Sequence, residues 1–304
     1  MYFSPVIRPN GGNAGFIFWH SRHAPDHDYH PPPSQPASRV TLALDGPAGA
    51  GKSSVARAVA RRVGYIYIDT GAMYRAVAYR AGRAGLEVGR DDAAIGKLAG
   101  EMRFEFRAVG DKQHLFVEGE DVEGPIRTPE VGNLSSPVSA IGEVRRHLVA
   151  AQRAMAAGGG VVMEGRDIGT VVLPGAEVKV FLTASEEERA RRRQEQMAEQ
   201  GVERGREQIL AEQRERDERD SSRALAPLCQ APDARRLVSD GMEKEEVVEL
   251  IVHWVEEAAC RARACAAPSA PAADQTGVPS VAAGRGTSCE SEFAAPRPTT
   301  EGTE

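Results

Sequence analysis

The sequence predicts an α/β protein built on a doubly wound parallel sheet. Short apolar runs of the kind buried inside a parallel sheet, such as 40–44 and 178–182, alternate with longer amphipathic stretches. A glycine-rich loop joins the run at 40–44 to an amphipathic stretch at 52–63, as in folds that pass from a strand through a tight loop into a helix. The chain has 304 residues, of which 41% are hydrophobic, so it can bury the core of one moderate domain or two small ones.

Each expected element follows from its own pattern of apolar residues. Strands are expected at 40–44, 65–68, 161–163, 178–182 and 237–239. Helices are expected at 52–63, 70–84, 92–101, 141–156, 185–200, 207–219 and 243–258. The clearest helix, 141–156, carries an apolar seam at helical spacing and is followed by a run of glycines, which favours a helix end.

The region 100–140 interrupts this alternation of strands and helices. Residues 103–107 and 114–118 alternate in polarity around a turn at 110–111, which predicts a hairpin. We therefore expect a small inserted domain at about 100–140 within a folded unit at 39–261.

The two ends of the chain differ in composition from the rest. Residues 1–38 hold seven of the nineteen prolines and four of the seven histidines, and residues 262–304 are rich in Ala, Pro and Ser. Because neither end offers enough apolar surface to offset its chain entropy, we expect both to be disordered.

Charge and composition argue against several classes of protein. The net charge of −6 gives no reason to expect nucleic acid or an anionic membrane as a partner. No apolar run approaches the roughly 20 residues of a membrane-spanning helix. The four cysteines form no Cys-x-x-Cys pair, as expected for free thiols in a reducing compartment. The thiols therefore indicate a cytoplasmic protein. Separately, we expect it to act as a monomer.

The residues from Gly46 to Ser53 read Gly-x4-Gly-Lys-Ser between the first strand and the first helix. In this context the glycines let backbone N–H groups surround phosphate oxygens, and the start of the helix adds its positive end. Lys52 can reach the outer phosphates, and the Ser53 hydroxyl can bind Mg²⁺. The pattern predicts a binding site for a nucleoside triphosphate.

Arginines occur at positions suited to phosphate chemistry. The candidates are Arg75, Arg166, Arg189, Arg193, Arg216 and Arg223, with Asp220 on the same helix face as the last two. Arg166 follows a predicted strand, at the edge where parallel sheets bind ligands. For Arg189 and Arg193 the alternative is a solvated helix face paired with the glutamates at 186–188. Beside a phosphate loop, guanidinium groups that match phosphate oxygens are the favoured interpretation.

Four runs of residues resemble the bacterial cytidylate kinases, in order and in spacing. They are Leu44-Asp-Gly-Pro-Ala-Gly-Ala-Gly-Lys-Ser, Ile68-Asp-Thr-Gly-Ala-Met-Tyr-Arg, Glu164-Gly-Arg-Asp-Ile-Gly-Thr-Val-Val-Leu-Pro and Arg216-Asp-Glu-Arg-Asp-Ser-Ser-Arg. The resemblance covers about residues 39–260. It implies the nucleoside monophosphate kinase type of the P-loop NTPase fold, with a monophosphate-binding insertion and a helical lid at about 186–219. The implied reaction is a direct, Mg²⁺-assisted transfer of phosphate from ATP to CMP or dCMP, giving CDP or dCDP.

The resemblance also implies a role for each site residue. The ATP phosphates would be held by Gly46, Pro47, Ala48, Gly49, Ala50, Gly51, Lys52, Ser53 and Ser54, and Mg²⁺ by Ser53. The acceptor would be bound by Thr70, Arg75, Arg166 and Arg223 at its phosphate, by Ser136, Arg145 and Asp167 at the cytosine, and by Arg216 and Asp220 at the ribose. The catalytic residues would be Lys52, Arg166 and the lid arginines Arg189 and Arg193.

Two features limit this resemblance. Glu164 stands where many members have Asp, so its carboxylate reaches one methylene further, and both ends of the chain lie outside the family core. One alternative function is a P-loop kinase for another nucleoside monophosphate or a small alcohol. Another is a nucleotide-dependent switch or nucleic-acid motor, although the sequence lacks the Asn-Lys-x-Asp base reader of a switch GTPase.

Overall fold

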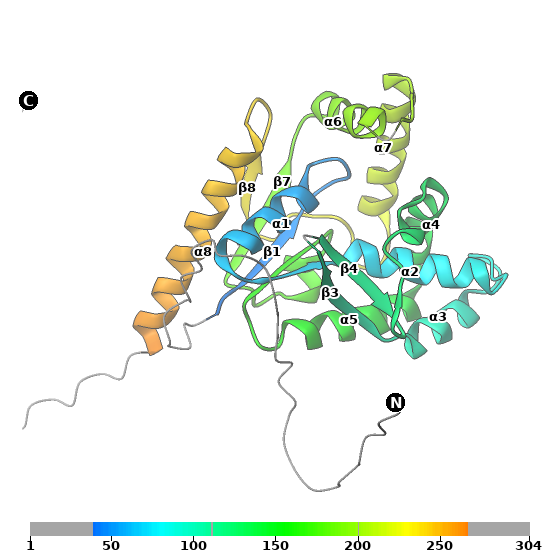
Figure 1. Ribbon diagram of the computed structural model, residues 1–304, viewed down its shortest axis with the longest axis horizontal. Coiled ribbons are helices and arrows are strands. Elements are labelled where there is room, and N and C mark those ends of the chain that lie inside the picture. Colours follow the sequence, from blue (N-terminus) through cyan, green and yellow to red (C-terminus); the bar gives the residue numbers. More distant parts are fainter. Residues whose placement is uncertain (1–38, 111, 200, 267–304) are drawn as a thin grey trace, which may run out of the picture. The chain divides into compact units, whose positions relative to one another are not determined.

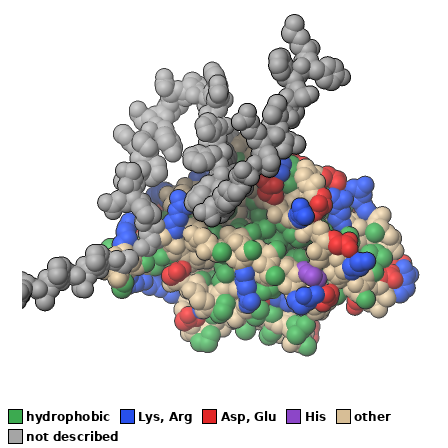
Figure 2. Space-filling view, turned by 90° about the horizontal axis from the view of Figure 1, so that it is seen from below, with side chains coloured by type: hydrophobic (Ala, Val, Ile, Leu, Met, Phe, Trp, Pro, Cys, Tyr) green, Lys and Arg blue, Asp and Glu red, His purple; other side chains and the backbone are tan. Residues whose placement is uncertain are grey.

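The computed structural model describes residues 39–110, 112–199 and 201–266 (Figure 1). The disorder predicted for 1–38 lies outside the described residues, as does that predicted for 262–304 beyond residue 266; residues 262–266 are helical, so the prediction is wrong there. On the face drawn in Figure 2, acidic and basic side chains are interspersed among apolar ones.

Five strands of the described chain form a parallel sheet in the order β2-β6-β1-β7-β8. They are β1 (Thr41–Asp45), β2 (Ile66–Asp69), β6 (Val161–Gly165), β7 (Val178–Thr183) and β8 (Arg235–Val238). The register places Asp45 beside Gly165, and Asp69 beside Glu164, at the carboxyl edge of the sheet. Strand β1 is followed along the chain by β2, which lies to one side of it in the sheet, whereas β6 is followed by β7, which lies to the other side of β1. The direction in which strands are added therefore reverses next to β1. Ligands bind at the carboxyl edge near such a reversal, so this edge is where a site is expected.

Helices cover both faces of this sheet (Figure 1). Helices α1 (Lys52–Val63) and α8 (Lys244–Ala266) pack on one face, against Leu42 and Leu44. Helix α5 (Gly142–Ala156) packs on the other face, where Ala43 and Met163 lie. Successive residues of β1 thus point into two different cores, as in a strand buried on both sides. This arrangement confirms the predicted fold class.

A second, antiparallel sheet within the described residues contains β3 (Phe104–Val109), β4 (Lys112–Val117) and β5 (Glu120–Asp121). Strands β3 and β4 are the predicted hairpin. The sequence pattern does not predict β5 or the short 3-10 helix η1 (Pro125–Arg127) that follows it. Leu115 and Ile126 pack against Ala72 of α2 (Thr70–Arg83), which joins this insertion to the main body.

The insertion also contains a helix that the sequence pattern does not predict, α4 (Pro129–Ala140). Its start carries recognisable signals, because the Thr128 hydroxyl accepts from the N–H of Val131 and Pro129 occupies the first turn. Its interior includes Gly132 and Pro137, which are poor helix formers and obscure the pattern. Packing against α2 overrides this weak local preference. Helix α3 (Asp92–Glu101) lies beside α5 as an expected element.

Two helices form a hairpin at the edge that carries the glycine-rich loop. Helices α6 (Glu186–Glu199) and α7 (Arg206–Ser222) share a small core of Ala190, Met197 and Ile209. In Figure 1 this pair lies above the loop that joins β1 to α1.

Two further elements differ from the sequence-based expectation. Strand β6 is followed by one π-helical turn, η2 (Ile168–Val172), which no periodicity predicts. Helix α8 continues to Ala266, so it passes both its predicted end at 258 and the predicted domain boundary at 261. None of the helices among the described residues combines the length and apolar character needed to cross a membrane.

Candidate active site

The glycine-rich loop wraps the carboxyl end of β1 and leads into α1. Gly46 has φ +150°, and a Cβ there would lie 1.9 Å from the carbonyl oxygen of Leu182. Gly49 has φ +76°, and a Cβ there would lie 2.6 Å from Nε2 of Gln213. Both positions therefore require glycine, and the loop keeps its backbone close to its neighbours.

Lys52 is a buried cation at the start of α1. Its Nζ donates to the carbonyl oxygen of Pro47 at 2.7 Å. Burial, followed by the positive charge of Arg166, lowers the pKa of Lys52 to about 7. An anion bound nearby would stabilise the charged form of Lys52. This environment therefore suits an anion-binding site.

Ser53 lies beside a buried carboxylate on β6. Glu164 accepts a hydrogen bond from the hydroxyl of Tyr67, and the Ser53 hydroxyl is near enough to lower its pKa. Burial, followed by the negative charge of Asp69, raises the pKa of Glu164. The hydroxyl of Thr70 donates to the carbonyl oxygen of Glu164 at 2.7 Å, so Thr70 is tied to the end of this strand.

Asp69 organises two arginines where β2 meets α2. Its carboxylate accepts the N–H of Ala72 as the helix cap, at 2.8 Å. The same carboxylate pairs with Arg75 at 2.9 Å and with Arg127 at 3.0 Å. Burial acts to raise the pKa of Asp69, but the two guanidinium groups outweigh it and hold the pKa at about 2. Asp69 therefore stays ionised and fixes the direction of both arginines.

Asp167, which lies two residues beyond the end of β6, contacts a second pair of arginines. Its carboxylate pairs with Arg145, and the Nη2 of Arg223 lies 3.5 Å from it. All three side chains are less than 10% exposed. The guanidinium of Arg145 also lies over the ring of Tyr74, with 5.8 Å between Cζ and the ring centre.

Asp220 on α7 organises a third group. It accepts from Nε of Arg166 at 3.0 Å and from the hydroxyl of Ser136 at 3.1 Å. Burial acts to raise the pKa of Asp220, but Arg166 and then Arg216 lower it below its usual value. Ser136 is thus placed against Asp220 and not within the Arg145–Asp167 pair with which it is expected to read the base.

Several buried guanidinium nitrogens in these groups make no hydrogen bond within the described protein. They are Nε of Arg75, Nε of Arg216 and Nη2 of Arg223, the last of which lies 3.5 Å from the Asp167 carboxylate without a hydrogen bond. Burial, followed by the charge of Arg166, lowers the pKa of Arg216 to about 10. Buried hydrogen-bond donors that lack acceptors and lie beside like charges are typical of an anion-binding site, where the ligand supplies the acceptors and the opposite charge.

The two predicted lid arginines have different environments. Arg189 is 7% exposed at its side chain, pairs with Asp217, and donates to the carbonyl oxygen of Ala48 at 2.9 Å. Arg193 is exposed and donates to Gln196 of its own helix at 2.8 Å. The structure brings Arg189 to the glycine-rich loop and leaves Arg193 apart from it.

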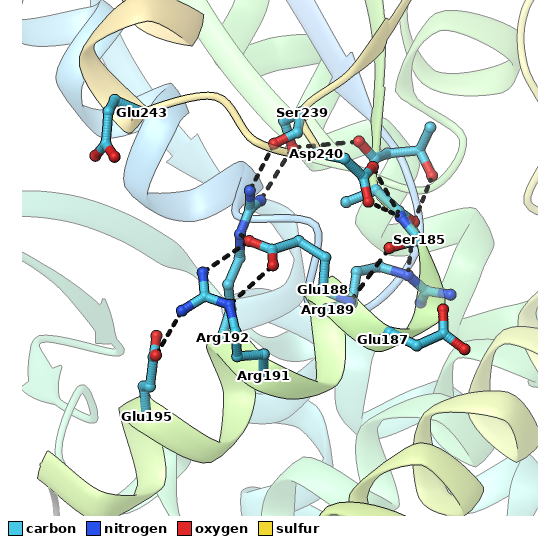
Figure 3. A network of polar contacts seen from close by, with 12 residues as sticks. Ser185, Glu187, Glu188, Arg189, Arg191, Arg192, Glu195, Ser239, Asp240 and Glu243 are labelled. Atoms are coloured by element: carbon cyan, nitrogen blue, oxygen red, sulfur yellow. Dashed lines mark hydrogen bonds and ion pairs between the residues drawn. The ribbon is translucent and has the colours of Figure 1, made fainter.

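A cavity of about 210 Å³ lies beside the glycine-rich loop, between α6 and the segment joining β8 to α8. Its lining includes Ala50, Gly51, Ser54, Arg191, Arg192, Ser239 and Met242. Figure 3 shows Arg192 reaching from α6 to Ser239, where it donates to the hydroxyl at 3.0 Å and to the carbonyl oxygen at 2.7 Å. Glu188 accepts from Arg191 and Arg192, which hold its pKa at about 2.

The structure adds residues that the sequence pattern does not assign to the site. Asp45, Asp69, Arg127, Asp217 and Arg192 all hold or extend it. Asp69 and Asp217 stand inside the two family-like runs at 68–75 and 216–223, so their position offered a signal. Asp45 ends β1, and its carboxylate accepts the N–H of Ile168 at 2.8 Å and of Gly169 at 2.7 Å. Burial raises the pKa of Asp45 to about 6, against the effect of these two hydrogen bonds.

Comparison with known proteins identifies the family. The family model described as Cytidylate kinase matches residues 42–257. A cytidylate kinase from Pelotomaculum thermopropionicum is 50% identical over 212 residues, covering 69% of this chain and 93% of that protein. A cytidylate kinase from Desulforamulus reducens is 52% identical and covers 71% of this chain and 96% of its own. One from Geobacter sp. is 49% identical and covers 72% of this chain and 93% of its own. The chain therefore belongs to the cytidylate kinase family.

Proposed function

We propose that this protein phosphorylates CMP and dCMP with ATP, and that it does so at the carboxyl edge of the parallel sheet. The observation that carries the proposal is the set of buried guanidinium nitrogens of Arg75, Arg216 and Arg223 that make no hydrogen bond among the described residues. The charges of Arg166 and Arg216 also act on Lys52, so these cations share one region with the glycine-rich loop. A donor and an acceptor that both carry phosphate supply the negative charge that such a region needs.

The donor is held by the glycine-rich loop and the cavity beside it. The backbone of the loop and the positive end of α1 would face the phosphates, and Lys52, whose Nζ donates to the Pro47 carbonyl oxygen, would supply a cation for the outer ones. The cavity adjoins the loop at Ala50 and Gly51 and offers polar and apolar walls at Ser239 and Met242. We assign this cavity to the adenosine of the donor.

Mg²⁺ fits the donor set at the start of α1. The Ser53 hydroxyl and the nearby Glu164 carboxylate would supply oxygen ligands, which suit this hard cation. Among the described residues, no group of three or more His, Cys, Asp or Glu side chains forms a metal cage. That agrees with Mg²⁺ bound through one or two protein oxygens, water and substrate phosphates. When bound, the ion would neutralise charge on the phosphate oxygens.

The acceptor lies between the three carboxylate-centred groups. Arg75, fixed by Asp69, and Arg166, fixed by Asp220, have the charge and direction to hold its phosphate. Asp167 retains lone pairs beyond those used by its arginines and can accept from the 4-amino group of cytosine. Uracil would present an oxygen to the same carboxylate, so the pairing favours CMP over UMP.

The residues at the site need no general base. The attacking group is a phosphate oxygen that is already anionic near neutral pH, so the protein acts by positioning and by stabilising charge. Closure of α6 and α7 over the loop would exclude water, which competes with the acceptor for the transferred group.

The proposal is tested by measuring ADP formation with a panel of acceptors. With ATP and Mg²⁺ fixed, we expect turnover with CMP and dCMP, weak turnover with UMP, and none with AMP or shikimate. Equal rates with all nucleoside monophosphates would contradict the proposed acceptor. ADP formation without any acceptor, stimulated by DNA or RNA, would favour a nucleic-acid motor instead.

We further propose that the enzyme acts as a monomer in the cytoplasm. All residues assigned above to donor and acceptor come from one chain, and the three cysteines among the described residues are free thiols, which suits a reducing compartment. Light scattering across the concentration range of the activity assay tests the first point, and a constant specific activity together with a monomer mass is expected.

A further inference from the structure

The glycine-rich loop is contacted by a carboxylate from the lid helix α7. The N–H of Ala48 donates to Oδ1 of Asp217 at 3.0 Å, across 169 residues of sequence. Oδ2 of Asp217 pairs with Nη1 of Arg189, and the same nitrogen donates to the carbonyl oxygen of Ala48 at 2.9 Å. Ala48, Asp217 and Arg189 therefore form a closed ring that joins the loop, α6 and α7.

The groups that Asp217 binds are of the kind that bind phosphate. Backbone N–H groups of a glycine-rich loop and a guanidinium both prefer an anionic oxygen, and a carboxylate offers two such oxygens. One N–H cannot donate fully to Asp217 and to a phosphate oxygen together. The negative charge of Asp217 also acts on Lys52, the cation assigned to the outer phosphates.

We propose that Asp217 is a competitor, built into the lid, for the phosphates of the donor. Its carboxylate occupies the N–H of Ala48 and the guanidinium of Arg189, and a phosphate chain that enters the loop displaces it from both. Binding of the donor and attachment of the lid to the loop therefore exclude each other, because both use the groups that Asp217 occupies. This inference depends on the proposed role of the loop as the ATP site, but it does not depend on the identity of the acceptor.

The competing interpretation makes Asp217 a fixed support that holds Arg189 in place while the donor is bound. The two interpretations predict opposite changes in affinity when the charge of Asp217 is removed. A competitor that is removed strengthens donor binding, because the loop N–H and Arg189 are no longer occupied. A support that is removed weakens donor binding, because Arg189 loses its direction.

The experiment measures binding by calorimetry, without turnover, in the full chain. The proteins are wild type, Asp217→Asn, and the control Glu218→Gln, which removes one charge from an exposed position of the same helix. The probes are ATP, inorganic tripolyphosphate, which carries only the phosphate part, and CMP. Because hydrogen bonds to charged groups are among the stronger ones, we expect Asp217→Asn to bind both ATP and tripolyphosphate about tenfold more tightly. CMP affinity should stay within about twofold, and Glu218→Gln should match wild type for all three probes.

Unchanged or weaker binding of tripolyphosphate by Asp217→Asn would overturn the proposal. Tighter ATP binding without tighter tripolyphosphate binding would also overturn it, since the effect would then arise at the adenosine. If the wild type binds ATP but does not phosphorylate CMP, the proposed acceptor fails while this test still stands.

A second measurement uses stability and covers the case of poor folding. Asp217→Asn should unfold at a lower temperature than wild type without ligand, and saturating tripolyphosphate should narrow that difference. A difference that stays constant or widens would count against exchange. Asp217→Ser removes the same charge at this partly exposed helix position and replaces the Asn variant if that variant is insoluble.

Discussion

The donor loop is the glycine-rich loop at 46–53, and the acceptor region is the set of side chains around Asp69, Asp167 and Asp220. Both are proposed to bind phosphate, but with different chemical groups. The donor loop is a continuous run, Gly46 to Ser53, and most of its binding groups are backbone N–H groups beside one lysine. The acceptor region collects side chains from α2, η1, α4, α5, the turn after β6, and α7, which lie far apart in the sequence. Five of its arginines each contact a buried carboxylate, that of Asp69, Asp167 or Asp220; they are Arg75, Arg127, Arg145, Arg166 and Arg223.

This difference separates general affinity from specificity. A backbone loop can bind any nucleoside triphosphate, because its N–H groups contact only the phosphates. Its sequence requires only glycines at certain positions and one cationic side chain. Paired side chains have fixed directions and can distinguish one base from another, but each depends on its partner for stability. Changes in the two regions should therefore affect catalysis, selectivity and stability in different proportions.

The largest effect is expected in the donor loop, for Lys52→Met. Activity should fall by about 10³-fold or more, because the cation facing the outer phosphates is lost. Stability should change in the opposite direction. The pKa of Lys52 is lowered from 10.5 to about 7, so its burial opposes folding below pH 7 and this penalty fades as the pH rises toward 10.

The Lys52→Met variant should thus be more stable than wild type at pH 6, with a smaller gain at pH 9. Urea unfolding at both pH values measures the gain, and Lys97→Met, at an exposed lysine of α3, is the control. A variant with normal kcat, or one less stable at pH 6, would contradict the role given to this buried charge.

In the acceptor region the corresponding change is Asp167→Asn. The preference for CMP over UMP, as a ratio of kcat/KM, should fall by about 10²-fold, since the carboxylate that accepts from the 4-amino group is gone. Stability should fall by about 3 kcal/mol, because Arg145 and Arg223 are left buried with an uncharged partner.

Steady-state kinetics with both acceptors and urea unfolding measure these two losses. Asp92→Asn is the control, because an Asn there can still accept from the N–H of Gly89. An unchanged CMP to UMP ratio would show that Asp167 does not read the base.

A smaller effect is expected at Asp69, which tests the acceptor region through pH. Its folded-state pKa is about 2 against an ordinary 3.8, so its ionised form stabilises the fold above pH 4 and the contribution is lost as the pH falls toward 2. The shift corresponds to about 2 kcal/mol. Asp69→Asn should be less stable than wild type by about this amount at pH 7, and the gap should shrink toward pH 2.

The same Asp69→Asn variant should have a raised KM for CMP and an unchanged KM for ATP, because Arg75 loses its charged partner and Arg127 keeps only Glu123. A gap in stability that does not vary between pH 7 and pH 2.5 would refute the electrostatic explanation.

The smallest effect is expected when residues 1–38 and 267–304 are removed together. Neither region contributes a residue assigned to the donor loop or to the acceptor region. Both KM values and kcat should stay within about twofold of the full chain, as a substitution away from any binding group does. A large rise in one KM alone would show that an end of the chain takes part in that region.

Much of this molecule follows from local sequence patterns. The strands at 40–44 and 178–182 and the helices at 52–63 and 92–101 agree closely with the structure, since their apolar periodicity reports burial directly. Helix α4 is missed because Gly132 and Pro137 weaken the local signal that Thr128 and Pro129 begin. β5 is too short to show alternation at all.

The donor loop was determined by the sequence alone, because its function depends on backbone conformation and on neighbours in the chain. Lys52 and Ser53 belong to one turn of one helix, so their relation is fixed once the pattern is present. The four runs that resemble the family also contain most of the residues predicted to bind the acceptor. They do not show which of these residues pair with each other.

Only the tertiary structure decided those combinations. Ser136 pairs with Asp220, Arg223 with Asp167, and Arg127 with Asp69, across separations that no local pattern encodes. It also separated Arg189, which donates directly to Ala48 of the loop and pairs with Asp217, from Arg193, which shares its helix but not its contacts. The physical reason is that pairing of buried charges depends on distance in space, which the packing of α2, α4 and α7 on the sheet sets.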